Sequence, residues 1–428
     1  MRAYILMTKN AFILNFFKLY NMLWRLSLPF LAKNKRLKFG FQKRISCFHL
    51  SKADIWIQAA SAGEAYLAVA ILKKLKPKTE TTVLVTSTTS QGVDILKPLL
   101  NRQDINKLIN LKIEWFPFDM PATIKKAVEI INPGVMVLLE TEIWPALLFY
   151  LKENQTKIFI INARLSKKSF SRYQKTIFLW KHLTPDIILA TSDQDAKRYK
   201  QIFKTTAVKT MPNIKFESIE TDSPDADTLN QIKQILPQTL PLTILASVRK
   251  QEEKDIVHIL KDILTLFPDQ VVALFPRHMH RLSAWERHLT SHGLPFKLKS
   301  GIQSSLTTPG IILWDTFGEL KTAYNFASVV FVGGSLKPLG GQNFIEPAIQ
   351  GAVTITGPYY DDFTWATNDI FKKGIVIKKD NWKAIAETIL KILENPVSKS
   401  DRKHLARKYL TSNQSGTRQA CSEILKAL

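Results

Sequence analysis

The chain has 428 residues, of which 45% are apolar, so it is long enough for two or three folded domains. It contains 60 Lys and Arg residues against 36 Asp and Glu residues, and its formal net charge is +24. This excess predicts an anionic partner, such as nucleic acid, phospholipid head groups or a phosphorylated substrate. Cys47 and Cys421 are the only cysteines, which argues against a disulfide framework or a cysteine-based zinc site.

The first 53 residues contain eleven Lys or Arg residues and no acidic residue. Within them, residues 11–31 are mostly apolar and predict a helix that Pro29 ends. Its polar residues recur three or four positions apart and share one stripe: Asn15, Lys18, Asn21 and Arg25. Because two of these are charged, we predict that residues 1–45 form a basic, monotopic anchor on an anionic membrane surface rather than a spanning helix. A helix packed against its own domain is the alternative.

From residue 54 onward, short runs rich in β-forming residues alternate with helical stretches, which predicts parallel sheets covered by helices on both faces. The predicted strands are 55–60, 82–86, 112–116, 135–139, 157–161, 187–190, 208–211, 242–246, 271–275, 311–314, 329–332 and 353–356. The polar residues 217–228 are predicted to link two domains. We therefore expect an α/β protein with two doubly wound, Rossmann-like domains, residues 46–220 and 221–428, that face a central cleft.

Three charged residues follow predicted strands of the first domain. Glu64 lies at the start of the helix predicted over residues 65–76, where a carboxylate can take a proton from a reacting hydroxyl or can complement the helix dipole. Glu140 follows a buried strand, where an acid is costly unless it is hydrogen-bonded or functional. Capping of the helix that begins near Pro145 is the alternative, and it is the only role that the sequence offers Glu142. Lys215 ends the domain, where it can neutralise a phosphate or a sugar carboxylate, or remain a surface charge.

The second domain contains three loops expected at the carboxyl ends of its strands. In the richest, the glycine-rich residues 333–341 precede Asn343, a helix-capping residue, and Glu346. Glycines let phosphate oxygens approach backbone N–H groups, and a carboxylate can accept hydrogen bonds from ribose. Arg277 offers a guanidinium for phosphate, and residues 315–320 offer a third loop. Each loop alone is explained as well by capping or surface chemistry, but the three together predict nucleotide binding.

Seven motifs appear in an order that resembles the Kdo (3-deoxy-D-manno-octulosonic acid) transferases of lipopolysaccharide biosynthesis. They are Ser61–Glu64 (SAGE), Glu140–Pro145 (ETEIWP), Asn162–Ser166 (NARLS), Asn213–Glu217 (NIKFE), Pro276–His278 (PRH), Asp315–Leu320 (DTFGEL), and Gly333–Ser335 (GGS) followed by Gly340–Asn343 (GGQN) and Glu346. The resemblance extends to about residue 363. It implies an inverting, metal-independent glycosyltransferase of the GT-B fold that uses CMP-Kdo as donor and a lipid A precursor (lipid IVA) as acceptor.

The resemblance also implies roles for individual residues. Glu64 matches the general base, and Glu140 and Lys215 match positions assigned to transition-state stabilisation. The residues that match the CMP-binding segments are Pro276, Arg277, Phe317, Gly318, Glu319, Asn343, Phe344, Ile345 and Glu346. Residues 46–220 would then bind the acceptor and residues 221–428 the donor.

The chain also departs from the family at three places. Gln58 and Gln342 stand where His is common, and Ser247-Val248-Arg249 stands where Ser-Thr-His is common. Because Gln cannot carry a proton charge, no proton-transfer role is assigned to these positions.

The motifs imply an enzyme without a metal or other cofactor. Its expected partners are CMP-Kdo, a phosphorylated lipid A precursor and an anionic membrane surface, with no nucleic acid. We expect it to be a peripheral, monotopic protein at the cytoplasmic face of the cell inner membrane. Two alternatives are a GT-B transferase that uses another nucleotide-sugar, and a non-catalytic basic protein that binds membranes or nucleic acid on an enzyme-like scaffold.

Overall fold

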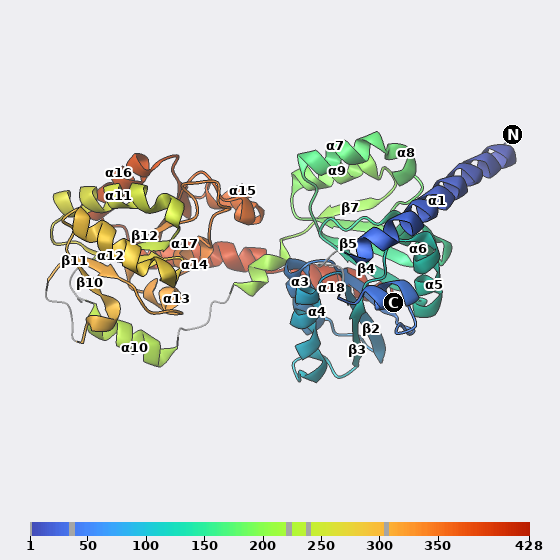
Figure 1. The fold of residues 1–428 in the computed structure, drawn as a ribbon, viewed down its shortest axis with the longest axis horizontal. Coiled ribbons are helices and arrows are strands. Elements are labelled where there is room, and N and C mark those ends of the chain that lie inside the picture. The colour runs from blue at the N-terminus through green and yellow to red at the C-terminus, as the bar shows by residue number, and fades with distance from the viewer. Residues whose placement is uncertain (1, 34–38, 220–224, 237–240, 304–307) are drawn as a thin grey trace. The chain divides into compact units, whose positions relative to one another are not determined.

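The computed structural model describes residues 2–33, 39–219, 225–236, 241–303 and 308–428 (Figure 1). The chain forms two compact units: residues 1–218 with residues 414–428, and residues 219–413. Within the described ranges, each unit contains a seven-stranded sheet whose paired strands are all parallel. This confirms the predicted fold class of two doubly wound α/β units. Residues 34–38 of the predicted anchor and 220–224 of the predicted linker lie outside the described residues.

The sheet of the first unit has the strand order β3-β2-β1-β4-β5-β6-β7. In chain order, the strands are β1 (Ile55–Ala59), β2 (Thr81–Ser87), β3 (Ile109–Trp115), β4 (Val135–Leu139), β5 (Lys157–Ala163), β6 (Ile187–Ala190) and β7 (Ala207–Thr210). The helices are α1 (Arg2–Ala32), α2 (Phe41–Ser46), α3 (Ala62–Lys74), α4 (Ser90–Leu96), η1 (Lys97–Asn101), α5 (Pro121–Ile131), α6 (Pro145–Glu153), α7 (Lys167–Lys175), α8 (Ile177–Trp180), α9 (Asp193–Ile202), η2 (Ile214–Ser218) and α18 (Gly416–Leu425). The winding reverses between β1 and β4, which are neighbours in the sheet. An open α/β sheet binds its ligands at such a switch point.

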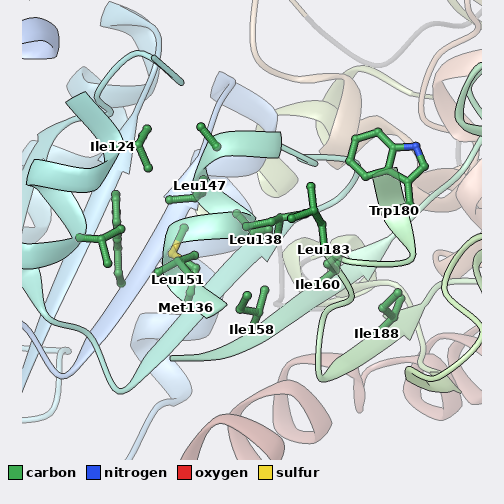
Figure 2. Packing of buried hydrophobic residues seen from close by; sticks show 14 of the residues in the cluster. Ile124, Met136, Leu138, Leu147, Leu151, Ile158, Ile160, Trp180, Leu183 and Ile188 are labelled. Carbon is green, nitrogen blue, oxygen red and sulfur yellow. The ribbon is translucent and has the colours of Figure 1, made fainter. Parts of the chain in front are cut away.

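The core of the first unit consists of two apolar clusters, one on each face of the sheet. Successive residues of β4 alternate between them, because Met136 and Leu138 belong to one cluster and Val137 belongs to the other. Figure 2 shows Leu147 and Leu151 of α6 packed near Met136 and Leu138. Because helices cover both faces of this parallel sheet, its strands are apolar throughout, and the sequence predicts them as continuous apolar runs.

The sheet of the second unit has the order β10-β11-β9-β8-β12-β13-β14, with its switch point between β8 and β12. The strands are β8 (Leu242–Val248), β9 (Val271–Pro276), β10 (Phe296–Leu298), β11 (Gly310–Leu313), β12 (Ala327–Val332), β13 (Val353–Thr356) and β14 (Val376–Lys378). The helices are α10 (Ala226–Ile235), η3 (Lys250–Glu252), α11 (Glu253–Leu266), η4 (Met279–Arg281), α12 (Leu282–Ser291), η5 (Lys299–Gly301), α13 (Leu320–Ala323), α14 (Ile345–Ile349), η6 (Asp361–Ala366), α15 (Thr367–Ile370), α16 (Trp382–Glu394) and α17 (Lys399–Asn413). The edge strands β10 and β14 were not predicted, because three residues are too few to show a period.

The C-terminal helix α18 belongs to the first unit, which corrects the predicted assignment of residues 221–428 to one domain. Its apolar residues Ala420, Cys421 and Ile424 are buried in the cluster that also contains Ile71 of α3. The Cys421 thiol donates a hydrogen bond to the carbonyl oxygen of Ile71 at 3.6 Å. Helical periodicity predicts that α18 has an apolar face, but it does not predict which of two cores receives that face.

Helix α1 continues to Ala32, so the prediction that Pro29 ends it was wrong. A proline in the last turn removes only one helix hydrogen bond, the one to the carbonyl of Arg25, and the helix ends three residues later in any case. No helix in the described part of the chain is long and apolar enough to cross a membrane.

Helix α1 has one packed face and one exposed face. Ile13 and Phe17 are buried against the first unit, and the ring of Phe17 lies 4.5 Å from that of Phe149 in α6. Tyr20 donates a hydrogen bond to Asp119 at 3.0 Å. The opposite side carries large apolar side chains that are 50–77% exposed: Leu14, Leu19, Met22, Leu23, Leu26 and Phe30. The face with Ile13 and Phe17 therefore fits the alternative of a helix packed on its own domain, whereas the exposed apolar face does not.

Candidate active site at the switch point of the first sheet

Glu64 lies in the first turn of α3, directly after β1. Its carboxylate accepts hydrogen bonds from the backbone N–H of Ala60 at 2.7 Å and from the Ser61 hydroxyl at 3.0 Å. Ser61 in turn caps the helix by accepting from the Glu64 N–H at 3.3 Å. The alternative role of Glu64, an acid in the first turn that complements the helix dipole, is therefore also present. The hydrogen bonds with Ala60 and Ser61 hold the Glu64 side chain in one orientation, with 7% of the residue exposed.

The surroundings of Glu64 favour its protonated form. Burial, followed by the negative charge of Glu142, raises the pKa of Glu64 to about 8, although the hydrogen bonds from Ala60 and Ser61 act in the opposite direction. Glu140 adds a smaller rise. A carboxylate whose pKa lies near neutral pH is suited to take a proton from a hydroxyl and release it later.

Glu140 follows β4, the strand that adjoins β1, so the two acids lie on either side of the switch point. Its backbone has a φ of 55°, in the left-handed region that a side chain with a Cβ seldom adopts. The Glu140 carboxylate accepts a hydrogen bond from the Lys215 ammonium at 2.8 Å, and both side chains are mostly buried. Backbone strain of this kind is commonly stored at functional sites.

Two buried amides hold the turn η2, which carries Lys215. Asn162, at the end of β5, accepts a hydrogen bond from the Ile214 N–H at 2.9 Å, and Asn213 accepts one from the Lys215 N–H at 2.9 Å. Asn162 also has a left-handed φ of 56° and is fully buried. The sequence identified the motifs containing these amides, but not that one motif anchors the other.

Glu142 is a further member of this site, and the sequence offered only a capping role for it. The structure shows that Asp119 caps α6 instead, accepting from the N–H groups of Ala146 at 3.1 Å and Leu147 at 2.9 Å. Glu142 accepts a hydrogen bond from the Trp144 indole at 2.6 Å and lies close enough to Glu64 to raise its pKa. No sequence signal identifies Asp119 as the cap, because it is 27 residues away from Ala146 in the chain.

At the position of Gln58, where we noted a departure from His, the side chain is fully buried in β1. Its carbonyl accepts a hydrogen bond from the Thr86 hydroxyl at 2.6 Å, and its amide nitrogen has no hydrogen-bond partner among the described residues. Gln58 thus packs in the sheet next to the site.

In the second unit, the loop after β12 is organised around a carboxylate. Glu252 accepts hydrogen bonds from the N–H groups of Gly334 at 2.6 Å, Ser335 at 2.9 Å and Leu336 at 2.9 Å. These amides are therefore occupied, which corrects the expectation that the first glycine pair cradles a phosphate. Gly333 is required for a different reason, since a Cβ there would lie 2.8 Å from the backbone carbonyl of Ser247.

The residues that match the CMP-binding segments lie at or after the carboxyl ends of β9, β11 and β12. Arg277 and Phe317 are exposed, and Phe317 is 87% exposed beside Gly318, whose φ is 91°. Pro276 is buried at the end of β9. The Glu319 carboxylate already accepts hydrogen bonds from side chains of its own unit, which are Lys299 at 2.8 Å, Trp314 at 2.7 Å and Thr316 at 2.6 Å.

Residues 343–346, at the start of α14, include two side chains that are buried in the core and two polar side chains that are hydrogen-bonded to each other. Phe344 and Ile345 are buried, and the Phe344 ring lies 5.4 Å from that of Phe363, so only their backbone groups can contact a ligand. Asn343 accepts from the Ile345 N–H at 3.0 Å and donates to the Glu346 carboxylate at 2.9 Å. These contacts hold the Glu346 carboxylate in place. Among the described residues, no group of three or more His, Cys, Asp or Glu side chains is arranged to hold a metal ion.

The topology of the two sheets is that of the GT-B fold. The crystal structure of a glycosyltransferase from Rickettsia africae ESF-5 superposes with a TM-score of 0.54 at 14% identity, covering 88% of this chain and 99% of that chain. At this identity the likeness concerns the fold alone.

Sequence comparison shows that the chain is similar to one family of transferases. Residues 33–218 match the family described as 3-Deoxy-D-manno-octulosonic-acid transferase (kdotransferase). The 3-deoxy-D-manno-octulosonic acid transferase of Haemophilus influenzae is 26% identical over 332 residues, which cover 76% of this chain and 75% of that protein. A bifunctional glycosyltransferase/methyltransferase of Fusobacterium nucleatum is 26% identical over 385 residues, 87% of this chain but only 58% of that protein. The chain is thus similar in sequence to Kdo transferases, the family that its motifs resemble.

Proposed function

We propose that this protein is a glycosyltransferase that transfers Kdo from CMP-Kdo to a hydroxyl of a phosphorylated lipid A precursor such as lipid IVA, with inversion at the anomeric carbon. The observation that carries the proposal is the convergence of Glu64, Glu140 and Lys215 at the switch point of the first sheet. The family match over residues 33–218 supports it, because that range contains all three residues.

In this reaction, the acceptor oxygen forms a bond to the anomeric carbon of Kdo while the bond to the phosphate of CMP breaks. The acceptor proton passes to Glu64, and CMP leaves with the electron pair of the broken bond. Glu64 needs to be ionised before it can act. Its raised pKa makes it a stronger base once ionised than an ordinary carboxylate, at the cost of a smaller ionised fraction at neutral pH.

Lys215 supplies positive charge for the negative groups of the donor, which are the Kdo carboxylate and the leaving phosphate. Glu140 orients the ammonium through the 2.8 Å hydrogen bond, and the amides of Asn162 and Asn213 fix the turn beneath it. A cation held before the substrate arrives requires no reorganisation during the reaction, which is the condition for electrostatic stabilisation of a transition state.

We also propose that the protein works at the cytoplasmic face of the inner membrane. The exposed face of α1 places Lys18 and Arg25 among the large apolar side chains of Leu19, Met22 and Leu26. Apolar side chains can enter the lipid boundary while the cations remain at anionic head groups. A membrane surface would also present a lipid acceptor to the first unit.

The test is to incubate the purified protein in detergent with CMP-Kdo and a tetraacylated lipid A precursor and to weigh the products by mass spectrometry. We expect mass gains of whole Kdo units with the wild type and none above background with Glu64→Gln. Glu129→Gln is the matched control, because Glu129 is an exposed acid of the same unit, and it should retain full activity.

Failure of the wild type beside an active control enzyme would reject CMP-Kdo transfer and favour another nucleotide-sugar. Full activity of Glu64→Gln would leave the transfer in place and remove Glu64 as its base.

A further inference from the structure

A basic cavity lies in the first unit between the C-terminal end of α3 and helix α18. These two helices lie side by side in the fold (Figure 1). Its volume is about 700 Å³, within the range of small-molecule sites. Glu64 lies ten residues before Lys74 on α3, which at 1.5 Å per residue places this cavity about 15 Å along the helix from the candidate base. The cavity is therefore separate from the candidate active site.

The lining of the cavity carries one sign of charge. Its basic side chains are Lys73, Lys74, Lys76, Lys78, Arg418 and Lys426, and no carboxylate lines it within the described residues. A neighbouring cavity of about 360 Å³ also has Lys76 and Lys78 in its lining, but that lining includes the acids Asp54 and Glu80 as well. Concave sites lined by one sign of charge concentrate ions of the opposite sign.

Half of these cations are already paired. Lys73 lies 3.2 Å from Asp104, Lys426 lies 3.3 Å from Glu423, and Lys74 pairs with Glu217. These acids lie outside the lining of the cavity. The other three cations are Lys76, Lys78 and Arg418, and none has an ion pair among the described residues. They are available for a ligand.

Helix dipoles explain only part of this cluster. Lys73 and Lys74 lie in the last turn of α3, where cations are favoured. Lys76 and Lys78 follow the end of that helix. Arg418 lies in the first turn of α18, where the positive end of the dipole disfavours a cation. Its presence there is consistent with recognition of an anion and not with helix stabilisation.

We propose that this cavity binds a phosphate monoester or diphosphate carried on a compact, partly apolar group. Arg418 can bind two phosphate oxygens in a bidentate manner, and Lys76 and Lys78 supply point charges beside it. Cys421 and Leu425 form an apolar part of the lining that would contact the remainder of the ligand. A cavity of this size accepts a nucleotide or a lipid head group and is too confined for a nucleic-acid duplex. The proposal does not depend on the proposed transferase activity.

The test is titration calorimetry of the full chain with inorganic pyrophosphate. All proteins carry Arg277→Ala, so that the exposed guanidinium of the second unit does not contribute. The test variant is Lys76→Glu/Lys78→Glu/Arg418→Glu. The matched control is Lys254→Glu/Arg287→Glu/Lys391→Glu, which changes the net charge equally at exposed positions of the second unit.

We expect saturable binding that is at least tenfold weaker in the test variant and unchanged in the control. Equal weakening in both would show a general effect of net charge, and absent saturable binding in the parent would also overturn the proposal. If the Glu variant does not fold, the same positions changed to Gln in both sets give the same comparison.

A second arm distinguishes the two sources of phosphate. Vesicles of phosphatidylcholine with phosphatidic acid are added during the titration, with pure phosphatidylcholine vesicles as the control. Competition by phosphatidic acid alone would assign the cavity to a lipid head group. Undiminished pyrophosphate binding would assign it to a soluble phosphorylated ligand.

Discussion

Replacement of Glu64 by Gln should stabilise the protein increasingly as the pH rises. Burial and the neighbouring acids raise the pKa of Glu64 from its ordinary value of 4.5 to about 8. The folded state therefore holds a proton that the unfolded chain releases. A raised pKa of this kind contributes stability that is fully present below pH 4.5 and is lost as the pH rises through 8. Gln mimics the protonated acid and does not lose this contribution.

The magnitude follows from the size of the shift. Each pKa unit corresponds to about 1.4 kcal/mol, so the wild type loses roughly 3 kcal/mol between pH 4.5 and 7 and roughly 4 kcal/mol by pH 8. Gln can preserve the local contacts, because its carbonyl can accept from the Ala60 N–H and its amide can donate to the Ser61 hydroxyl. The variant should thus be more stable and inactive.

The assay is urea unfolding followed by circular dichroism at several pH values between 5 and 9. The stability difference between Glu64→Gln and wild type should grow by about 1.4 kcal/mol per pH unit up to about pH 8 and then level off. Glu129→Gln removes an exposed acid, and its curve should run parallel to that of the wild type. Parallel curves for Glu64→Gln and wild type would refute the reasoning, because they would mean that Glu64 has an ordinary pKa.

Three other outcomes are expected. Asn162→Ala removes the buried acceptor of the Ile214 N–H, which should lower the free energy of unfolding by about 1–3 kcal/mol. Amide hydrogen exchange in a peptide covering η2 should therefore become faster, and unchanged exchange there would contradict the anchoring role. Glu252→Ala should lower the free energy of unfolding by at least about 3 kcal/mol, because several buried N–H groups lose a charged acceptor. A decrease below about 1 kcal/mol in urea unfolding would mean that Glu252 does not organise this loop. Leu23→Ser/Leu26→Ser should lower the fraction of protein that floats with anionic vesicles by about tenfold. The melting temperature should not change, because both side chains are exposed. An unchanged floating fraction would exclude this face of α1 from membrane contact.

The sequence by itself determined the architecture, because the signals for it are local. The apolar runs Val135–Leu139 and Val353–Thr356 have the same bounds in the structure as in the prediction, since a strand covered on both faces is apolar throughout. The positions of Glu64 and Glu140 were readable for a related reason. Glu140 directly follows such a run, Glu64 lies in the first turn of the helix after another, and parallel strands end at a common edge of the sheet.

The tertiary structure decided which of these groups act on one another. Asp119 caps α6, and Glu252 fills the glycine-rich loop that the sequence offered to a phosphate. Helix α18 returns to the first unit and completes the basic cavity with α3. In each case the partners are far apart in the chain, and periodicity and capping patterns describe only neighbours within a few residues. Packing determines which partner a buried carboxylate or an apolar helix face contacts, and that partner is known only from the folded chain.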